Sequence, residues 1–432
     1  MSSRLFALLV LSSGICAGCT SGASLPAAPG AISPHTASLS EGSPDITQGN
    51  DGAKFTDVLS VSDTCEAGPG PAGLTTGPDH TVWYIDDCLN SVYKFDMKRA
   101  IVTTQLNGIP EWITEGPDSN MWVTIRNSAK IAKVTPRGSV TYFNQSCTNS
   151  QTSLNEIATG ADGNLWFTTF GSSLPGTGIG KITPAGVATC FSTSRPFTAG
   201  IVAGPDGNIW FAEPQAPTML GKITPAGVLT EYPDPEFCVG MITAGDGNLY
   251  CASLHGIVRI DTHTAAETVV TPFGETTSLA TSGTGADAVL YYADGHTKLE
   301  TLHLSNGNVT RDLIPSNQGH AVYVAYGPDK NLWYTAHGNQ GSSFVSVDLF
   351  RILTAVPAAL TLAAGQSQQV TASETHFTLQ NFAGSSSNTA VATIVPAGQR
   401  GVFTVKGIAA GSAVLTIHDT TFNSVTIGVT VQ

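Results

Sequence analysis

The segment GPDGNIWFAE at residues 204–213 recurs along the chain and determines the fold. Its seven copies begin at residues 77, 116, 160, 204, 244, 285 and 327, a spacing of 39 to 44 residues. Each copy places an Asp-containing turn between two apolar runs, which is typical of a β-hairpin. A unit of this length holds four short strands, the size of one propeller blade. The repeat therefore predicts an all-β fold with a seven-bladed β-propeller over residues 53–355.

A second motif follows each hairpin by about 20 residues, in keeping with a four-stranded unit. It reads GKITPAG at 180–186 and at 221–227, AKVTPRG at 132–138 and VRIDTHT at 258–264. Its turn separates a third strand from a fourth, outer strand. The last repeat lacks an outer strand of its own, and Lys54–Val61 has no place before the first repeat. We expect Lys54–Val61 to complete the last blade, which removes an exposed sheet edge.

All seven copies contain an aspartate in the first turn. A calcium site would need several such acids together, but each lies in its own hairpin, where an Asp side chain accepts hydrogen bonds from turn amides. The aromatic residues that follow are interpreted as packing between neighbouring blades. The aspartates are Asp79, Asp118, Asp162, Asp206, Asp246, Asp287 and Asp329, and the aromatics are Trp83, Trp122, Trp166, Trp210, Tyr250, Tyr291 and Trp333. Repeated residues build the ring, so function is expected where the copies differ.

The N-terminus is predicted to be an export signal. Arg4 precedes the apolar run Leu5–Ile15, which is too short to span a membrane permanently. The sequence Cys16-Ala17-Gly18-Cys19 resembles the bacterial lipobox, which implies that residues 1–19 are a lipoprotein signal with Cys19 as the acylated residue. An ordinary cleaved signal peptide is the alternative. Residues 20–52 contain no Lys or Arg and are predicted to be a flexible tether.

Charge excludes one class of partner. Residues 53–355 contain 16 Lys and Arg against 27 Asp and Glu, and the whole chain has a net charge of −13. Binding to nucleic acid depends on neutralising phosphates with a basic surface. We therefore expect no nucleic-acid partner.

Residues 356–432 follow a different pattern, with alternating apolar and polar residues and glycine turns. The segment GIAAG before a Thr-Ile strand, with Gly407, Gly411, Thr416 and Ile417, resembles the bacterial group 2 immunoglobulin-like domain. That resemblance implies a small β-sandwich that serves as a spacer or adhesive unit.

Six cysteines remain after Cys16 and Cys19, and an even number in an exported chain favours disulfides. Sequence alone leaves all pairings open, but neighbouring cysteines belong to one blade or its entry loop. We therefore expect the pairs Cys65–Cys88, Cys147–Cys190 and Cys238–Cys251, which would stabilise the loops of one face. No spacing of Cys and His residues indicates zinc.

The blade pattern GPDGNxWF(T/A)E…GKITPAG…TEY resembles that of the streptogramin B lyase (virginiamycin B lyase) family, whose fold is a seven-bladed propeller. The resemblance implies a carbon–oxygen lyase that opens a cyclic depsipeptide by elimination, with Mg²⁺ polarising the ester and a histidine as base. The family's acidic ligands end the WFTE strand. Of the seven equivalent positions only Glu213 matches by type, while Asp86 and Asp294 are possible substitutes.

The family's histidine position on the first strand holds no histidine in any repeat. His320, two residues before the equivalent Val322, and His337 are the nearest candidates for a base. Glu111 and Asn155 occupy the same first-strand position in other repeats, so the candidate metal ligands, for Mg²⁺, are Glu213, Asp294, Glu111 and Asn155.

Two hypotheses follow. The first is a cell-surface binding or scaffold protein with a lipid anchor, in the outer membrane or at the cell surface. We prefer it because the set of lyase residues is incomplete. Its loop face would bind a small molecule, glycan or protein. The second is a metal-dependent lyase or lactone hydrolase on the same ring.

Overall fold

The computed structural model describes residues 46–48, 54–61, 71–95, 101–148, 152–171, 178–195, 197–215, 217–253, 255–271, 278–294, 297–314, 320–338, 341–348, 353–374, 382–399, 401–418 and 424–432. These residues form β-strands, turns and one short 3₁₀ helix, η1 (Gly285–Asp287). No helix in this part of the chain is long and apolar enough to cross a membrane. The fold is all-β, as predicted.

The described residues form two compact units. The first comprises the described residues up to Ser282, with Leu290–Glu300 and Arg311–Asp348. The second comprises Gly283–Val289, Thr301–Thr310 and the described residues after 348. The predicted boundary between residues 355 and 356 stays a prediction.

Each sequence repeat forms one antiparallel sheet, so residues 54–348 contain seven sheets among those described. The first strands are β3 (Pro71–Gly77), β7 (Pro110–Glu115), β11 (Thr152–Thr159), β15 (Ala199–Ala203), β19 (Gly240–Thr243), β23 (Leu279–Ser282) and β27 (His320–Tyr326). The second strands, which carry the motif aromatics, are β4 (Thr81–Asp86), β8 (Met121–Ile125), β12 (Leu165–Gly171), β16 (Ile209–Glu213), β20 (Leu249–Ala252), β24 (Val289–Asp294) and β28 (Leu332–Gly338).

The remaining strands lie farther from the centre of the ring. The third strands are β5 (Ser91–Phe95), β9 (Lys130–Val134), β13 (Ile179–Ile182), β17 (Met219–Ile223), β21 (Ile257–Ile260), β25 (Lys298–His303) and β29 (Gly341–Asp348). The fourth strands are β6 (Ile101–Gln105), β10 (Val140–Asn144), β14 (Ala188–Phe191), β18 (Leu229–Pro233), β22 (Glu267–Thr271) and β26 (Val309–Leu313).

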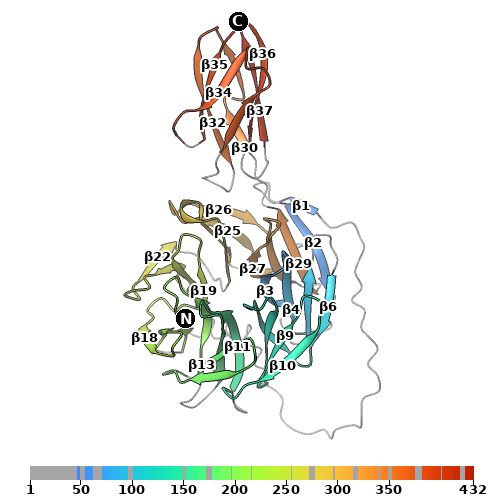
Figure 1. Ribbon diagram of the computed structural model, residues 1–432, viewed down its shortest axis with the longest axis vertical. Helices are drawn as coiled ribbons and strands as arrows, with labels where there is room; N and C mark the ends of the chain where they lie inside the picture. The colour runs from blue at the N-terminus through green and yellow to red at the C-terminus, as the bar shows by residue number, and fades with distance from the viewer. Residues whose placement is uncertain are drawn as a thin grey trace. The chain divides into compact units, whose positions relative to one another are not determined.

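The first strands contact one another in cyclic order, and β27 of the last repeat contacts β3 of the first. Figure 1 shows these sheets arranged around a common centre. The last sheet takes its outer strand from the N-terminal side, because β2 (Lys54–Val61) pairs antiparallel with β29. This confirms the predicted position of Lys54–Val61. A short strand, β1 (Ile46–Gln48), pairs with β2.

The hairpin motif holds its aromatic residue by a short side-chain bridge. Asp206 Oδ1 accepts a hydrogen bond from the Trp210 indole nitrogen at 3.1 Å and from the Asn208 amide at 3.2 Å. Gly204 leaves room for this indole, because a Cβ there would lie 2.4 Å from Trp210 Cδ1. The predicted turn role is thereby confirmed for Asp206, and the equivalent amide also donates to Asp118, Asp162, Asp246 and Asp329. The indole is an additional donor that the sequence did not indicate.

The buried aromatics join neighbouring sheets, as predicted. Trp122 packs in one apolar cluster with Leu165 and Phe167 of the next repeat, and Trp210 with Leu249 of the repeat that follows its own. Both indoles are fully buried. Each interface between sheets is therefore a separate small core, and together these cores hold the ring.

The C-terminal residues form two four-stranded sheets. One has the order β30-β32-β35-β34 and the other β31-β37-β36-β33. The strands are β30 (Leu353–Val356), β31 (Ala359–Leu362), β32 (Ser367–Glu374), β33 (Ala383–Ser386), β34 (Ala392–Pro396), β35 (Val402–Gly407), β36 (Gly411–His418) and β37 (Ser424–Val431). Their alternating inward residues form one core that includes Leu360, Val405 and Ile427.

Candidate functional site

Strand direction gives the ring two faces. The turn face carries the turn between the first and second strands and the turn between the third and fourth strands. The loop face carries the loops after the second strands and the connections from one sheet to the next. The predicted site residues belong to the loop face, so it is described first.

A β-bulge recurs in the first strands near the loop face. The pairing register shifts between Ala72 and Leu74, Pro110 and Trp112, Leu154 and Ile157, Ala199 and Ile201, and Ala321 and Tyr323. A bulge re-aims the side chain of the extra residue. The candidates Glu111 and Asn155 occupy bulges, as does Glu156 beside Asn155, so these polar side chains are displaced from the regular alternation of their strands.

Glu111 lies beside the half-buried Arg126. Its Oε2 accepts a hydrogen bond from Arg126 Nε, and Arg126 Nη1 lies 3.3 Å from Asp87 Oδ2. Both carboxylates are 7% exposed. Burial raises the pKa of Asp87 to about 7, although Arg126 opposes the shift. Burial also raises the pKa of Glu111. Arg126 thus neutralises carboxylates from two neighbouring repeats.

Glu156 adds a third acid to this group. Its Oε1 and Oε2 accept hydrogen bonds from the Gly200 and Ile201 amides, at 3.0 and 3.3 Å, at the bulge of the next repeat. Burial raises its pKa to about 7, and the two amide hydrogen bonds partly oppose this. Trp112 and Tyr323 form an edge-to-face pair beside these charges, with ring centroids 5.4 Å apart. We call Asp87, Glu111, Arg126, Glu156, Trp112 and Tyr323 the central cluster.

The four candidate metal ligands each have another partner. Glu111 is paired with Arg126, Asn155 Nδ2 donates to the Thr198 carbonyl at 2.9 Å, and Asp294 Oδ2 lies 3.1 Å from Lys298 Nζ. Glu213 is fully buried, and its Oε2 accepts a hydrogen bond from Ser194 Oγ at 3.4 Å. Burial raises the pKa of Glu213 to about 8, and the nearby Glu231 adds to the shift.

The candidate ligands that the structure describes do not fit the implied Mg²⁺. Among the described residues, no group of three or more His, Cys, Asp or Glu side chains is arranged to hold a metal ion. Arg126 already supplies a positive charge at Glu111, and it would repel a second cation on the same carboxylate.

The backbone places the two candidate bases opposite each other. His320 begins β27, His337 lies in β28, and their Cα atoms are direct partners across the two strands. The bulge at Val322 interrupts the regular alternation that would place His320 on the same face as Val322. Their side chains lie outside the described part of the structure, so a catalytic role for His320 or His337 stays a prediction.

Two of the three predicted disulfides lie among the described residues. Cys147–Cys190 and Cys238–Cys251 are present, and Cys88 is also disulfide-bonded. Cys65, the predicted partner of Cys88, lies outside the described residues, as does Cys19.

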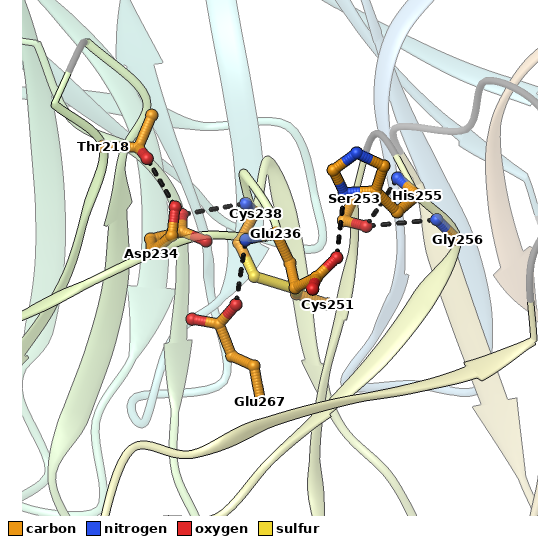
Figure 2. Close-up of a disulfide and its surroundings, with 9 residues drawn as sticks. All are labelled: Thr218, Asp234, Glu236, Cys238, Cys251, Ser253, His255, Gly256 and Glu267. Atoms are coloured by element: carbon orange, nitrogen blue, oxygen red, sulfur yellow. Dashed lines mark hydrogen bonds and ion pairs between the residues drawn. A yellow bond between two sulfur atoms is a disulfide. The ribbon is translucent and has the colours of Figure 1, made fainter.

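Figure 2 shows that acidic side chains surround Cys238–Cys251. Asp234 Oδ2 accepts a hydrogen bond from the Cys238 amide at 2.9 Å, and Glu267 Oε2 accepts one from the Glu236 amide at 3.1 Å. Glu236 Oε2 also lies 2.9 Å from His255 Nδ1. Burial raises the pKa of Glu267 to about 8, and the neighbouring Asp234 carboxylate adds to the shift. The disulfide therefore lies in a loop whose backbone amides donate hydrogen bonds to carboxylates.

Comparison with known proteins supports one part of the fold. The virginiamycin B lyase family model matches residues 58–173. A streptogramin B lyase structure has 22% identity and a TM-score of 0.59, and the match covers 69% of this chain and 98% of that one. Virginiamycin B lyase from Staphylococcus aureus has 22% identity and a TM-score of 0.58, with coverage of 69% and 100%.

A third structure covers more of the chain. The extracellular domain of a candidate one component system from B. thetaiotaomicron has 12% identity and a TM-score of 0.51, and the match covers 90% of this chain and 62% of that one. No curated protein sequence matches the chain significantly. At these identities the likeness concerns the fold. The chain therefore carries a virginiamycin B lyase-like β-propeller.

Proposed function

We propose that this chain is an exported, lipid-anchored binding protein whose seven-bladed propeller holds its ligand at the loop face. Cys19 is the lipid attachment site, and residues 20–52 are the tether to the cell envelope. The C-terminal sandwich is an immunoglobulin-like spacer. Disulfides favour an oxidising compartment, and the likeness to an extracellular domain agrees with export.

The observation that carries the binding function is the ion pair between Glu111 and Arg126. Glu111 is the first-strand acid expected to face a metal, and here an arginine of its own sheet neutralises it. Removing Arg126 would leave buried carboxylates without a counter-charge, which is costly. In the central cluster the counter-charge of the carboxylates is therefore the guanidinium of Arg126 and not an exchangeable metal ion. A ligand at the cluster would meet positive and negative side chains and the aromatic pair of Trp112 and Tyr323.

Titration with Mg²⁺, followed by thermal melting, tests this proposal. The binding function predicts that Mg²⁺ leaves the melting temperature of the wild-type protein unchanged, since an ion that does not bind the folded state does not stabilise it. The Glu213→Ala variant is the control, because it removes the residue that best matches the family's ligand. A Mg²⁺-dependent rise in melting temperature that Glu213→Ala abolishes would contradict the proposal.

One observation favours the alternative, a metal-dependent carbon–oxygen lyase or a lactone hydrolase. His320 and His337 are direct Cα partners, so the two candidate bases lie at the same end of the two neighbouring strands β27 and β28. Incubation with virginiamycin B, followed by chromatography, would separate the ring-opened product from the substrate. The lyase alternative requires that product to form and to disappear in a His320→Ala variant.

A further inference from the structure

The turn face contains a series of lysines that join neighbouring repeats. In each of the first four repeats, the lysine of the third strand is the Cα partner of the motif tryptophan. Lys222 Nζ lies 5.0 Å from the centre of the Trp210 ring and donates a hydrogen bond to the Thr262 carbonyl of the next repeat at 3.3 Å. The other three donate to the carbonyls of Pro136, Pro184 and Pro225.

The fifth repeat departs from this arrangement. Arg259 is the Cα partner of Tyr250, so it occupies the position of the lysine. Arg259 is exposed and forms no hydrogen bond or ion pair with any described residue. The turn that follows is one residue longer than its counterparts, since Ile260 pairs with Glu267 whereas Ile223 pairs with Leu229.

Arg259 and the longer turn both line a groove of about 740 Å³ between the fourth and fifth repeats. It is lined by Pro205, Asp206, Gly247, Asn248, Leu249, Arg259, Ile260, Asp261, Thr262, His263, Ala266 and Thr268. The longer turn contributes His263, whose side chain is 92% exposed. A volume of this size accommodates a sugar or a short oligomer of one.

Both acids of the groove already accept hydrogen bonds from the protein. Asp206 accepts from the Trp210 indole and from Asn208, and Asp261 Oδ1 accepts from the His263 and Thr264 amides at 2.9 Å. Arg259 has no such partner. Its guanidinium presents a fork of donors that matches a carboxylate or another oxyanion.

We propose that this groove is a second binding site, distinct from the central cluster, for a sugar that carries an acid group. Arg259 pairs with the acid group. The hydroxyl groups of Thr262 and Thr268, with the side chain of Asn248, exchange hydrogen bonds with the sugar hydroxyls. Lys222 fixes the wall of the groove, because it holds the Thr262 carbonyl. Asp206 and Asp261 also line the groove, so binding of an acid group depends on the guanidinium of Arg259.

Isothermal titration of the full chain with D-galacturonate tests the proposal, with D-galactose as the neutral probe. We expect galacturonate to bind and galactose to bind at least about tenfold more weakly, which corresponds to the loss of a hydrogen bond to a charged group. Arg259→Gln should weaken galacturonate binding by the same factor. No binding of galacturonate, or equal binding by Arg259→Gln, would overturn the proposal.

Two controls sharpen the test. Arg137 is also an exposed arginine, in the shorter turn of the second repeat, so Arg137→Gln should leave the affinity unchanged. An equal loss of affinity in Arg137→Gln would mean that binding depends only on the total charge of the protein. That result would overturn the proposed site at Arg259. Titration with galactose 6-sulfate shows which kind of acid group the site prefers. Weaker binding than that of galacturonate supports a site for a carboxylate. Tighter binding would overturn the proposed preference for a carboxylate and indicate a site for a sulfate.

Discussion

At the scale of single residues, the motif GPDGNxW works as one unit. The aspartate fixes the turn amide and the indole together, and the first glycine leaves space for the ring. In the first repeat the same link passes through Thr81, which donates to Asp79 and accepts from Trp83. The indole is therefore linked to the turn aspartate directly in the fourth repeat and through a threonine hydroxyl in the first. What the two repeats share is the link between the ring and the turn.

This unit predicts the effect of Asp206→Ala. The change leaves the Trp210 indole and the Asn208 amide without their acceptor, so we expect a loss of about 1–3 kcal/mol in the free energy of unfolding. Urea unfolding measures it. Asp206→Asn keeps an acceptor oxygen and should lose less. If both variants matched the wild-type protein, the bridge would have no role in stability.

Glu267 predicts how stability depends on pH. Burial and Asp234 raise its pKa from 4.5 to about 8, so the folded state binds this proton more tightly than the unfolded state. Its stabilising contribution is complete below about pH 4.5 and is lost as the pH rises through about 8. Glutamine resembles the protonated carboxyl, so Glu267→Gln should match the wild-type protein at low pH and exceed its stability above pH 8.

Unfolding by urea at several pH values measures this difference. Buried acids that do not interact with Glu267 contribute equally to the protein with and without the substitution. Asp234 interacts with Glu267, so the difference between the two proteins reports the titration of this pair of carboxyls. A difference that stays constant with pH would contradict the proposed effect of burial and of Asp234 on this carboxyl.

At the scale of elements, the β-bulges decide which residues form the site. The hairpin spacing located each first strand, and it placed Glu111 and Asn155 at the correct positions. It contained no signal for the extra residue that moves Glu156 toward the centre, because a bulge changes pairing without changing composition. Asp87 was missed for a related reason, since its role depends on Arg126 of the next repeat. Contacts between repeats are not encoded in the spacing of one repeat.

The strand β2 predicts how the ring responds to shortening. It pairs along the whole of β29, so its removal exposes a long sheet edge. A chain that lacks residues 1–61 should melt at a lower temperature and associate, as measured by thermal melting and size-exclusion chromatography. A chain that lacks only residues 1–45 keeps β1 and β2 and is the matched control. Equal behaviour of the two chains would mean that the ring does not depend on this strand.

At the scale of the whole molecule, the repeats separate structure from function. The residues shared by most repeats form the turns, the interfaces between sheets and the lysine series. Residues that differ between repeats include the central cluster on the loop face and Arg259 in the groove on the turn face. A ring of similar sheets tolerates such differences because each interface has its own core, so a change in one repeat leaves the other interfaces intact.

The two kinds of β-structure predict different responses to a reductant. The disulfides of the described residues lie in the propeller, whereas residues 353–432 contain no cysteine and have a core made of their own residues. A disulfide stabilises the fold by constraining the unfolded chain. The gain is about 3 kcal/mol for a loop of about 15 residues, which is close to the separation of 13 between Cys238 and Cys251.

Calorimetry of the full chain should therefore show two transitions, and dithiothreitol should lower the midpoint temperature of only one. The transition it leaves unchanged should match that of the fragment 353–432 alone. A single transition, or an equal shift of both, would show that the sandwich does not unfold independently of the propeller.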